Sequence, residues 1–303
     1  RLPALRSWPK EAGRYLTLAL SVTADDQTGK SNLGLYRAQI LSENAIALNF
    51  SPQSDAGVQL RRCMQRKAEM PVVLILGGDP ALIWAAAAPL PSGCSEIDFL
   101  ARLFEEDSTF SECITQPLKI PSNAELVIEG WIDPVEVCTE GPFGNHTGSY
   151  VTRNDCPLMH VSAVRYRENP ILPLTVVGPP PSENVYLGMA NQILIKAMLQ
   201  SDYPELLDLY MPLETIFHGA ALVKVKYRNQ GDMEDLIRRL WNNGPLSRSK
   251  LLILLDPDIE LKQLNRCWWR TVNLLGSGRV FQNGGRTAID ATGVDPEWLI
   301  ADD

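Results

Sequence analysis

One glycine-rich stretch, EGPFGNHTG (residues 140–148), gathers residue types that are able to do chemistry. Glu140 opens the stretch, and Asn145 and His146 follow it closely. The glycines permit a positive φ or a close backbone approach and Pro142 stiffens the chain, so the spacing predicts a tight turn. Such a turn aims a carboxylate, an amide and an imidazole at one place, which suits acid–base work. A glycine-rich hairpin loop whose polar groups satisfy their own backbone is the alternative interpretation.

The composition excludes several classes of function. The 303 residues are 45% hydrophobic and 21% charged, which is ordinary for a soluble globular protein. A formal net charge of −8 without any basic run argues against a nucleic-acid partner, because phosphate binding needs clustered Lys and Arg. No apolar run is long enough to predict a membrane span. The six cysteines are scattered without a CxxC pair, which favours reduced thiols and a cytoplasmic location.

Residues 1–165 are expected to be rich in strands, because β-type runs alternate with turn residues. The short segment 42–44 separates two of these runs as in a hairpin. Asp79 and Pro80 suit the cap and the first position of a short helix over residues 81–88. The expected strands cover residues 15–24, 32–41, 45–50, 71–76, 124–132 and 158–167.

Residues 166–303 show a different pattern, in which strands and helices alternate. This order predicts a right-handed crossover and a small α/β domain. Trp268 and Trp269 fall within one expected helix, where they are interpreted as core or interface anchors. The expected helices cover residues 187–200, 231–243 and 260–275, and the expected strands cover residues 220–227 and 250–255.

Five segments, in order along the chain, resemble the signature of the UbiD family, decarboxylases that use prenylated flavin mononucleotide (FMN). They are NLGLYR (32–37), PLPSGCSE (89–96), EGPFGNHTG (140–148), VVGPPPSENVYLG (176–188) and GGRTAIDATG (284–293). The resemblance implies an α/β (α+β) fold, a split β-barrel of the flavin-binding kind followed by a smaller α/β domain. It assigns the barrel with its flavin and metal site to residues 1–165. A return strand and an α/β oligomerisation domain are assigned to residues 166–303, so a homo-oligomer is expected.

The resemblance also implies a catalytic trio, which falls on Arg37, Glu140 and Asn145. Arg37 would hold the substrate carboxylate by a bidentate contact, a task that Lys fills poorly. Glu140 would pair with Arg37, and the third position would donate the proton that replaces carbon dioxide. Asn145 carries an amide there, which cannot act as a general acid at neutral pH, and His146 is the alternative donor. We expect the trio to converge on one cavity.

The implied cofactors are prenylated FMN and Mn²⁺ (or Mg²⁺). The metal positions fall on Asn32, Gln53 and Glu96, and Asn32 and Glu96 are expected to approach closely enough to share a cation. Gln53 replaces the family's histidine, and Ser54 and Asp55 stand where the family has an Arg-Gly pair that helps to hold the phosphate. The charge of Asp55 would repel a phosphate. The flavin positions fall on Leu35, Tyr36, Arg37, Asn49, Phe50, Ser51 and Arg286. A flavin prenyltransferase is the implied supplier of the cofactor.

Three functions from different classes stay open at this point. The first is a non-oxidative decarboxylase of an aromatic or α,β-unsaturated carboxylic acid. The retained residues favour it: Arg37, Glu140, Asn32 and Glu96. The second is a non-catalytic relative that acts as a binding or assembly subunit. The departures favour it: Asn145, Gln53, Ser54 and Asp55. The third is a flavin protein with other chemistry, which rests on the split barrel alone.

Overall fold

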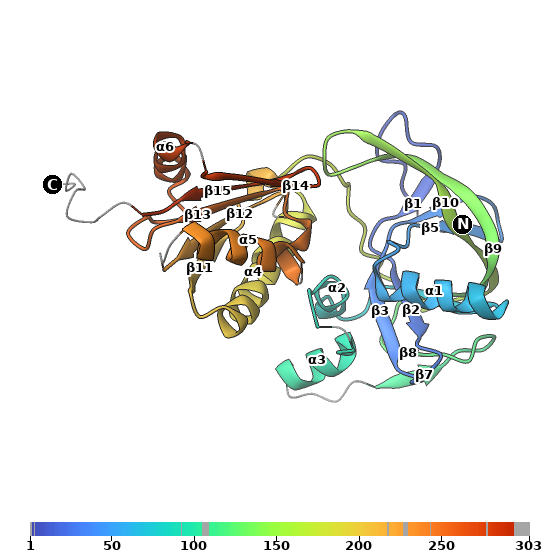
Figure 1. Cartoon of the computed structure of the whole chain (residues 1–303). Coiled ribbons are helices and arrows are strands. Elements are labelled where there is room, and N and C mark those ends of the chain that lie inside the picture. Colours follow the sequence, from blue (N-terminus) through green and yellow to red (C-terminus); the bar gives the residue numbers. More distant parts are fainter. Residues whose placement is uncertain are drawn as a thin grey trace. The chain divides into compact units, whose positions relative to one another are not determined.

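The chain forms two compact units, Arg1–Ser182 and Glu183–Asp303 (Figure 1). A computed structural model describes residues 2, 4–91, 93–104, 109–216, 218–226, 230–242, 244–276 and 278–293. The change of pattern in the sequence predicts a boundary after residue 165, whereas residues 166–182 pack with the first unit. Backbone and side-chain bonds tie them there: the Arg167 N–H donates to the Glu125 carbonyl over 2.9 Å. The Thr17 hydroxyl likewise exchanges two bonds of 2.9 Å with the Thr175 backbone.

The described part of the first unit is built on an eight-stranded antiparallel sheet. Its spatial order is β1-β4-β5-β10-β9-β6-β2-β3. The two longest strands, β9 and β10, curve strongly and curl the sheet into a half-barrel (Figure 1). The strands are β1 (Arg14–Leu16), β2 (Leu20–Ala24), β3 (Ser31–Leu35), β4 (Ala38–Ile40), β5 (Ala45–Leu48), β6 (Met70–Leu76), β9 (Leu126–Gly144) and β10 (Tyr150–Tyr166).

Short helices cover both faces of this sheet. Strand β6 shows the arrangement: Val72 and Leu74 join a core with helix α1 (Asp55–Arg66), whereas Val73 and Ile75 join a core with α2 (Ala81–Ala85) and α3 (Glu96–Phe104). Alternate residues of a strand point to opposite faces, so a strand that is apolar on both faces must be covered on both. A small two-stranded sheet of β7 (Phe110–Glu112) and β8 (Lys119–Pro121) completes the unit.

Local predictions for the first unit are partly confirmed. Strands β4 and β5 pair as the expected hairpin around residues 42–44. Asp79 accepts the Ala81 N–H over 2.8 Å at the start of α2. The prediction of a single strand over residues 15–24 is wrong, because the strand is interrupted between β1 and β2. Thr17 turns its hydroxyl to the Thr175 backbone there, and the two strands pair at opposite ends of the sheet.

The glycine-rich stretch is also different from the expected turn. Glu140–Gly144 continue strand β9, and the chain reverses over Asn145–Ser149, where the Asn145 N–H donates to the Ser149 carbonyl over 2.9 Å. Gly141 has a φ of 103°, which residues with a side chain rarely adopt. The glycine therefore serves to bend a paired strand directly after Glu140.

The described part of the second unit contains a five-stranded sheet in the order β11-β12-β13-β15-β14. The three central strands are parallel and both edge strands are antiparallel. This is the small α/β domain that the alternating pattern predicts. The elements are α4 (Glu183–Asp202), β11 (Leu206–Tyr210), β12 (Ala220–Val225), α5 (Gln230–Asn242), β13 (Leu251–Leu255), α6 (Leu264–Leu274), β14 (Val280–Asn283) and β15 (Arg286–Ala291), with single helical turns at Leu213–Thr215 and Pro245–Arg248.

Helices cover both faces of the central strands (Figure 1). Leu252 and Leu254 of β13 join a core with α4 and α5, and Ile253 and Leu255 join a core with α6. Helix α6 starts four residues later than expected, and its Trp268 and Trp269 are exposed rather than part of the core. Tyr227, the end of one expected strand, lies outside the described residues.

Three other expectations concern whole segments. Residues 167–182 are all described and contain no strand, so the expected return strand is absent there. The six cysteines, all within the described ranges, are free thiols. Among the described residues, no helix is both long and apolar enough to cross a membrane.

A buried ion pair holds the carboxyl edge of the second sheet together. Arg270 of α6 donates to Asp256 (3.0 Å), which follows β13, and to Asp258 (2.9 Å). The other Asp256 oxygen accepts the Gly293 N–H over 2.9 Å. The Arg270 and Asp256 side chains are 4% and 6% exposed, so neither charge has water as a substitute partner.

We therefore expect Arg270→Leu to lower the free energy of unfolding by about 3–5 kcal/mol, because it leaves the buried Asp256 charge without its cation. The matched control is Arg238→Leu on α5, which removes a pair with Glu234 that is more than half exposed. That control should cost less than about 1 kcal/mol. Urea unfolding of the two variants measures the difference, and equal losses would contradict this role for Arg270.

Candidate active site

Arg37 and Glu140, far apart in the sequence, form a bidentate ion pair in the first unit. Arg37 lies between β3 and β4, and its Nε and Nη2 donate to the two Glu140 oxygens over 2.8 and 2.7 Å. Glu140, on β9, is 0% exposed, whereas the Arg37 side chain is 20% exposed. Two parallel charge-assisted bonds fix the guanidinium plane and engage Nε and Nη2, so Nη1 is the nitrogen that they leave for another acceptor.

Two neighbours complete the surroundings of this pair. The Asn49 side-chain amide donates to Glu140 over 2.8 Å, and its backbone N–H donates to the Arg37 carbonyl over 3.3 Å. The Phe143 ring lies 4.6 Å from the Arg37 guanidinium carbon, a cation–π distance. Three segments of the chain, around residues 37, 49 and 140–143, therefore meet at one buried charge.

Gln39 and Tyr15 hold the strand that carries Glu140. The Gln39 side-chain oxygen accepts the Gly141 N–H over 2.8 Å and the Tyr15 hydroxyl over 3.1 Å. Burial and, after it, the charge of Glu140 raise the pKa of Tyr15, so its hydroxyl stays a donor at neutral pH. Neither residue stands out in the sequence as a candidate for the site, although Gln39 lies only two positions after Arg37.

Asn145 lies in the turn between β9 and β10, five residues after Glu140. Its side-chain oxygen accepts the His146 N–H over 2.7 Å, and its carbonyl accepts the Gly148 N–H over 3.0 Å. Within the described chain, the hydrogen bonds of Asn145 all stay inside this turn. The structure therefore joins Arg37 to Glu140, as expected, but gives no contact between Asn145 and that pair.

Of the predicted metal residues, Asn32 lies on β3, Gln53 precedes α1 and Glu96 begins α3. The Glu96 carboxylate accepts the N–H of Leu33, the residue after Asn32, over 3.1 Å. The Asn32 amide nitrogen donates to Thr23 over 3.0 Å, which leaves the amide oxygen as the atom suited to a cation. Burial, with a smaller contribution from the Asp55 charge, raises the pKa of Glu96. The Gln53 side-chain oxygen accepts the Ser51 hydroxyl over 3.0 Å.

No group of three or more His, Cys, Asp or Glu side chains forms a metal cluster among the residues that the structure describes. Two oxygen-bearing side chains, those of Asn32 and Glu96, therefore remain the predicted ligands, rather than a closed cage. Such a donor set suits a hard cation that keeps several other ligands, as Mg²⁺ does.

The predicted flavin positions fall into two places. In the first unit, the Tyr36 and Phe50 rings meet edge to face with centroids 4.8 Å apart, so residues 35–37 and 49–51 lie side by side. In the second unit, Arg286 donates to the Trp241 and Ser247 carbonyls, each over 3.1 Å. Its guanidinium is thus engaged within its own unit.

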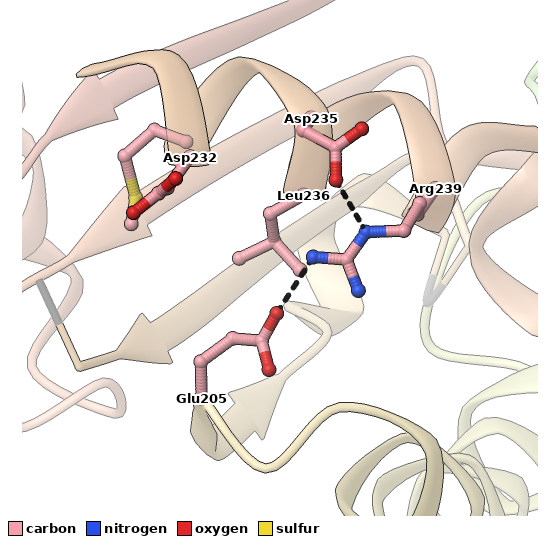
Figure 2. Close-up of a pocket in the computed structure, with 6 residues that line it drawn as sticks. Glu205, Asp232, Asp235, Leu236 and Arg239 are labelled. Carbon is pink, nitrogen blue, oxygen red and sulfur yellow. Dashed lines mark hydrogen bonds and ion pairs between the residues drawn. The ribbon is translucent and has the colours of Figure 1, made fainter. Parts of the chain in front are cut away.

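The second unit has a separate pocket of about 130 Å³ beside α5, which Figure 2 shows. Glu205, Asp232 and Asp235 bring three carboxylates to it, and Arg239 donates to Glu205 and Asp235 over 2.8 Å each. The Arg239 guanidinium is therefore already bonded to two of the three carboxylates in this pocket. The bond to Asp235 is an ordinary i,i+4 pair on the surface of α5, and the bond to Glu205 pairs a buried carboxylate, so both are accounted for structurally.

Two family profiles match the chain. Residues 1–180 match the 3-octaprenyl-4-hydroxybenzoate carboxy-lyase Rift-related domain (UbiD), and residues 185–291 match the 3-octaprenyl-4-hydroxybenzoate carboxy-lyase C-terminal domain. Uncharacterized proteins of Archaeoglobus fulgidus and Aquifex aeolicus are each 34% identical, over 92% and 88% of this chain. The matches cover 58% and 55% of those proteins, so the chain spans little more than half the length of these curated relatives.

Solved structures agree with the fold. The dimeric form of the UbiD-class enzyme HmfF from Pelotomaculum thermopropionicum, in complex with prFMN, superposes with a TM-score of 0.85 at 22% identity. The closed form of vanillic acid decarboxylase from Sedimentibacter hydroxybenzoicus gives 0.87 at 24% identity. All of this chain is covered in both cases, with 70% and 68% of the respective structures. Since the two family profiles together cover nearly the whole chain, and the curled sheet and the α/β unit match these structures, the chain belongs to the UbiD family.

Proposed function

We propose that this chain carries the site of a non-oxidative decarboxylase that acts on an aromatic or α,β-unsaturated carboxylic acid with prenylated FMN. The bidentate Arg37–Glu140 pair is the observation that supports this most directly. Of its two charged groups, Glu140 is fully buried and only the Arg37 side chain is partly exposed, so only Arg37 can meet a substrate. Family membership supports carboxy-lyase chemistry. The solved relatives include enzymes described as UbiD-class and as a decarboxylase.

Arg37 is the group that binds the substrate carboxylate in this proposal. Glu140 engages its Nε and Nη2, so the remaining Nη1 edge is directed to the substrate in a fixed orientation. Glu140 cannot turn away, because Asn49 holds one of its oxygens and the side chain is fully buried. The pair is neutral overall, so Arg37 orients the carboxylate more than it attracts it from a distance.

The flavin would lie against residues 35–37 and 49–51, which meet beside the ion pair. When bound, the prenylated flavin supplies an electron sink for the bond that breaks. Asn32 and Glu96 fit the associated Mn²⁺ or Mg²⁺, since both offer oxygen atoms to a hard cation. A cation there would also offset the charge of Asp55, which reaches Glu96 electrostatically.

A non-catalytic UbiD relative that serves as a binding or assembly subunit is the second candidate. Its specific support is Asn145, whose side-chain oxygen accepts the N–H of the next residue, His146. The side-chain amide cannot donate a proton as a general acid at neutral pH. The homo-oligomer, the flavin prenyltransferase as supplier and the cytoplasmic location all stay predictions.

The proposal is tested with protein co-expressed with a flavin prenyltransferase and assayed against a panel of aromatic and α,β-unsaturated acids. Arg37→Lys should lower kcat/KM by about 10- to 100-fold, because a charged hydrogen bond contributes about 1.5–3 kcal/mol and Lys cannot make the bidentate pair. The exposed Arg14→Lys is the matched control and should leave kcat/KM unchanged. Absence of decarboxylation by flavin-loaded wild type would refute the proposal and favour the non-catalytic relative.

The proton-transfer step gives a second prediction. Asn145→Asp restores a general acid at the position that the family uses, so turnover should rise by about 10²–10⁴-fold where proton delivery limits the rate. Stopped-flow and steady-state assays of the loaded enzyme measure it. His146→Ala should lower turnover only if His146 has become the donor. An unchanged rate for Asn145→Asp with bound cofactor would show that proton delivery at residue 145 does not limit the reaction.

The metal site gives a third prediction. A cation at about ten times its dissociation constant should raise the free energy of unfolding by about 1.4 kcal/mol. We expect this gain for wild type with Mn²⁺. At the same concentration, Zn²⁺ should give a smaller gain, because it prefers nitrogen and sulfur ligands. Glu96→Gln should lose the Mn²⁺ effect, and the exposed Glu112→Gln should keep it. Equal stabilisation of both variants in urea unfolding would place the cation elsewhere.

A further inference from the structure

The carboxylate of Glu11 is buried away from the Arg37–Glu140 pair, with only 2% of the residue exposed. One of its oxygens accepts the backbone N–H groups of Ser7 and Trp8 over 2.6 and 3.2 Å. The other accepts the Gly144 N–H over 3.3 Å. A buried charge is tolerated only when hydrogen bonds replace its water, and here backbone donors from two distant segments do so.

Gly144 is the last residue of β9 and directly precedes Asn145. The Trp8 ring lies so close to it that any Cβ at this position would collide with the ring. Trp8 is itself anchored, since its indole N–H donates to the Val177 carbonyl over 2.7 Å. The approach of Trp8 and Glu11 therefore requires glycine at residue 144.

The same segment also reaches the other strand of the hairpin. The Lys10 N–H donates to the hydroxyl of Tyr150, the first residue of β10, over 3.4 Å. The Ala12 N–H donates to the Pro142 carbonyl over 3.0 Å. Residues 8–12 thus contact both strands that flank the turn at 145–149.

We propose that Glu11 is a positioning residue, which fixes the 145–149 turn through its bond to the Gly144 N–H. It acts through the backbone and does not touch the substrate. Its catalytic consequence rests on the proposed function, in which this turn presents residues 145 and 146 to the reacting atoms. Its structural consequence, a turn held by the segment before β1, is independent of that function.

Glu11→Gln is the informative change, because it keeps the size of the side chain. An amide has one acceptor oxygen where the carboxylate has two. If that oxygen stays with the Ser7 and Trp8 N–H groups, the NH₂ group faces the Gly144 N–H, a donor against a donor. The variant should therefore release Gly144 while it keeps the turn at residues 7–8.

Hydrogen–deuterium exchange of the full chain, read by mass spectrometry, measures this release. We expect exchange of the peptide that covers residues 143–150 to accelerate about tenfold in Glu11→Gln, since one hydrogen bond contributes about 1 kcal/mol or more. The matched control is Glu129→Gln, a fully buried carboxylate in the same unit that accepts the Ile114 and Thr115 N–H groups. The control should accelerate exchange around residues 114–115 and not at residues 143–150.

Trp8→Leu provides a second variant that retains Glu11 and removes the ring from Gly144, at a side chain that is already partly exposed. It should also accelerate exchange at residues 143–150. Unchanged exchange there in both Glu11→Gln and Trp8→Leu would overturn the proposal. Equal acceleration in Glu129→Gln would do the same, because the effect would then be general destabilisation.

Kinetics separate this proposal from the proposed function. In flavin-loaded protein, Glu11→Gln should lower kcat by about tenfold and leave KM within about twofold, because Arg37 still holds the substrate carboxylate. Wild type without decarboxylase activity would refute the proposed function, and the exchange data would still decide the role of Glu11. An active Glu11→Gln variant with wild-type exchange would refute the positioning role alone.

Discussion

The first unit is organised around one constraint, the burial of the Glu140 charge. Moving a carboxylate out of water costs several kcal/mol, and only well-aligned hydrogen bonds offset this cost. Arg37 supplies two of them and Asn49, from another segment, supplies a third. The β3–β4 connection, the chain after β5 and the bend of β9 at Gly141 must therefore reach their native places together. The hydrogen bonds that stabilise the buried Glu140 charge therefore also orient the Arg37 guanidinium.

A comparison with the second unit shows why this pair differs from a purely structural one. Arg270 and Asp256 are both almost fully buried, so their bonds serve only the packing of α6 against the sheet. In the Arg37–Glu140 pair the acid is buried completely but the guanidinium keeps an accessible edge. Under the proposed function, this difference in exposure between Glu140 and Arg37 matters for substrate binding. A substrate carboxylate that leaves as carbon dioxide loses its negative charge. Arg37 must therefore orient this carboxylate without binding it too tightly, and the charge of Glu140 weakens the attraction between Arg37 and the substrate.

The sequence predicted what depends on short-range patterns and on matched motifs. The hairpin of β4 and β5, the α/β order of the second unit and the Arg37–Glu140 pairing are confirmed. The break between β1 and β2 was not predictable, because it depends on Thr175, far along the chain. The supports of Gln39, Tyr15 and Glu11 were missed for a similar reason. Gln39 and Glu11 accept backbone N–H groups, and Tyr15 donates to Gln39. No residue pattern identifies the partners of backbone groups before the fold is known.

Retention of Arg37 and Glu140 carries less functional information than it first suggests. A chain that lost catalysis but kept Glu140 would still need Arg37, because an unpaired buried carboxylate would destabilise the unit. Among the described residues, the Asn145 side chain bonds only to the His146 N–H and the Gln53 side chain only to the Ser51 hydroxyl. Neither side chain holds a distant segment in place, so the identity of these two residues is free to follow function. The proton-donor position and the metal position at residue 53, rather than the ion pair, therefore distinguish a decarboxylase from a non-catalytic relative.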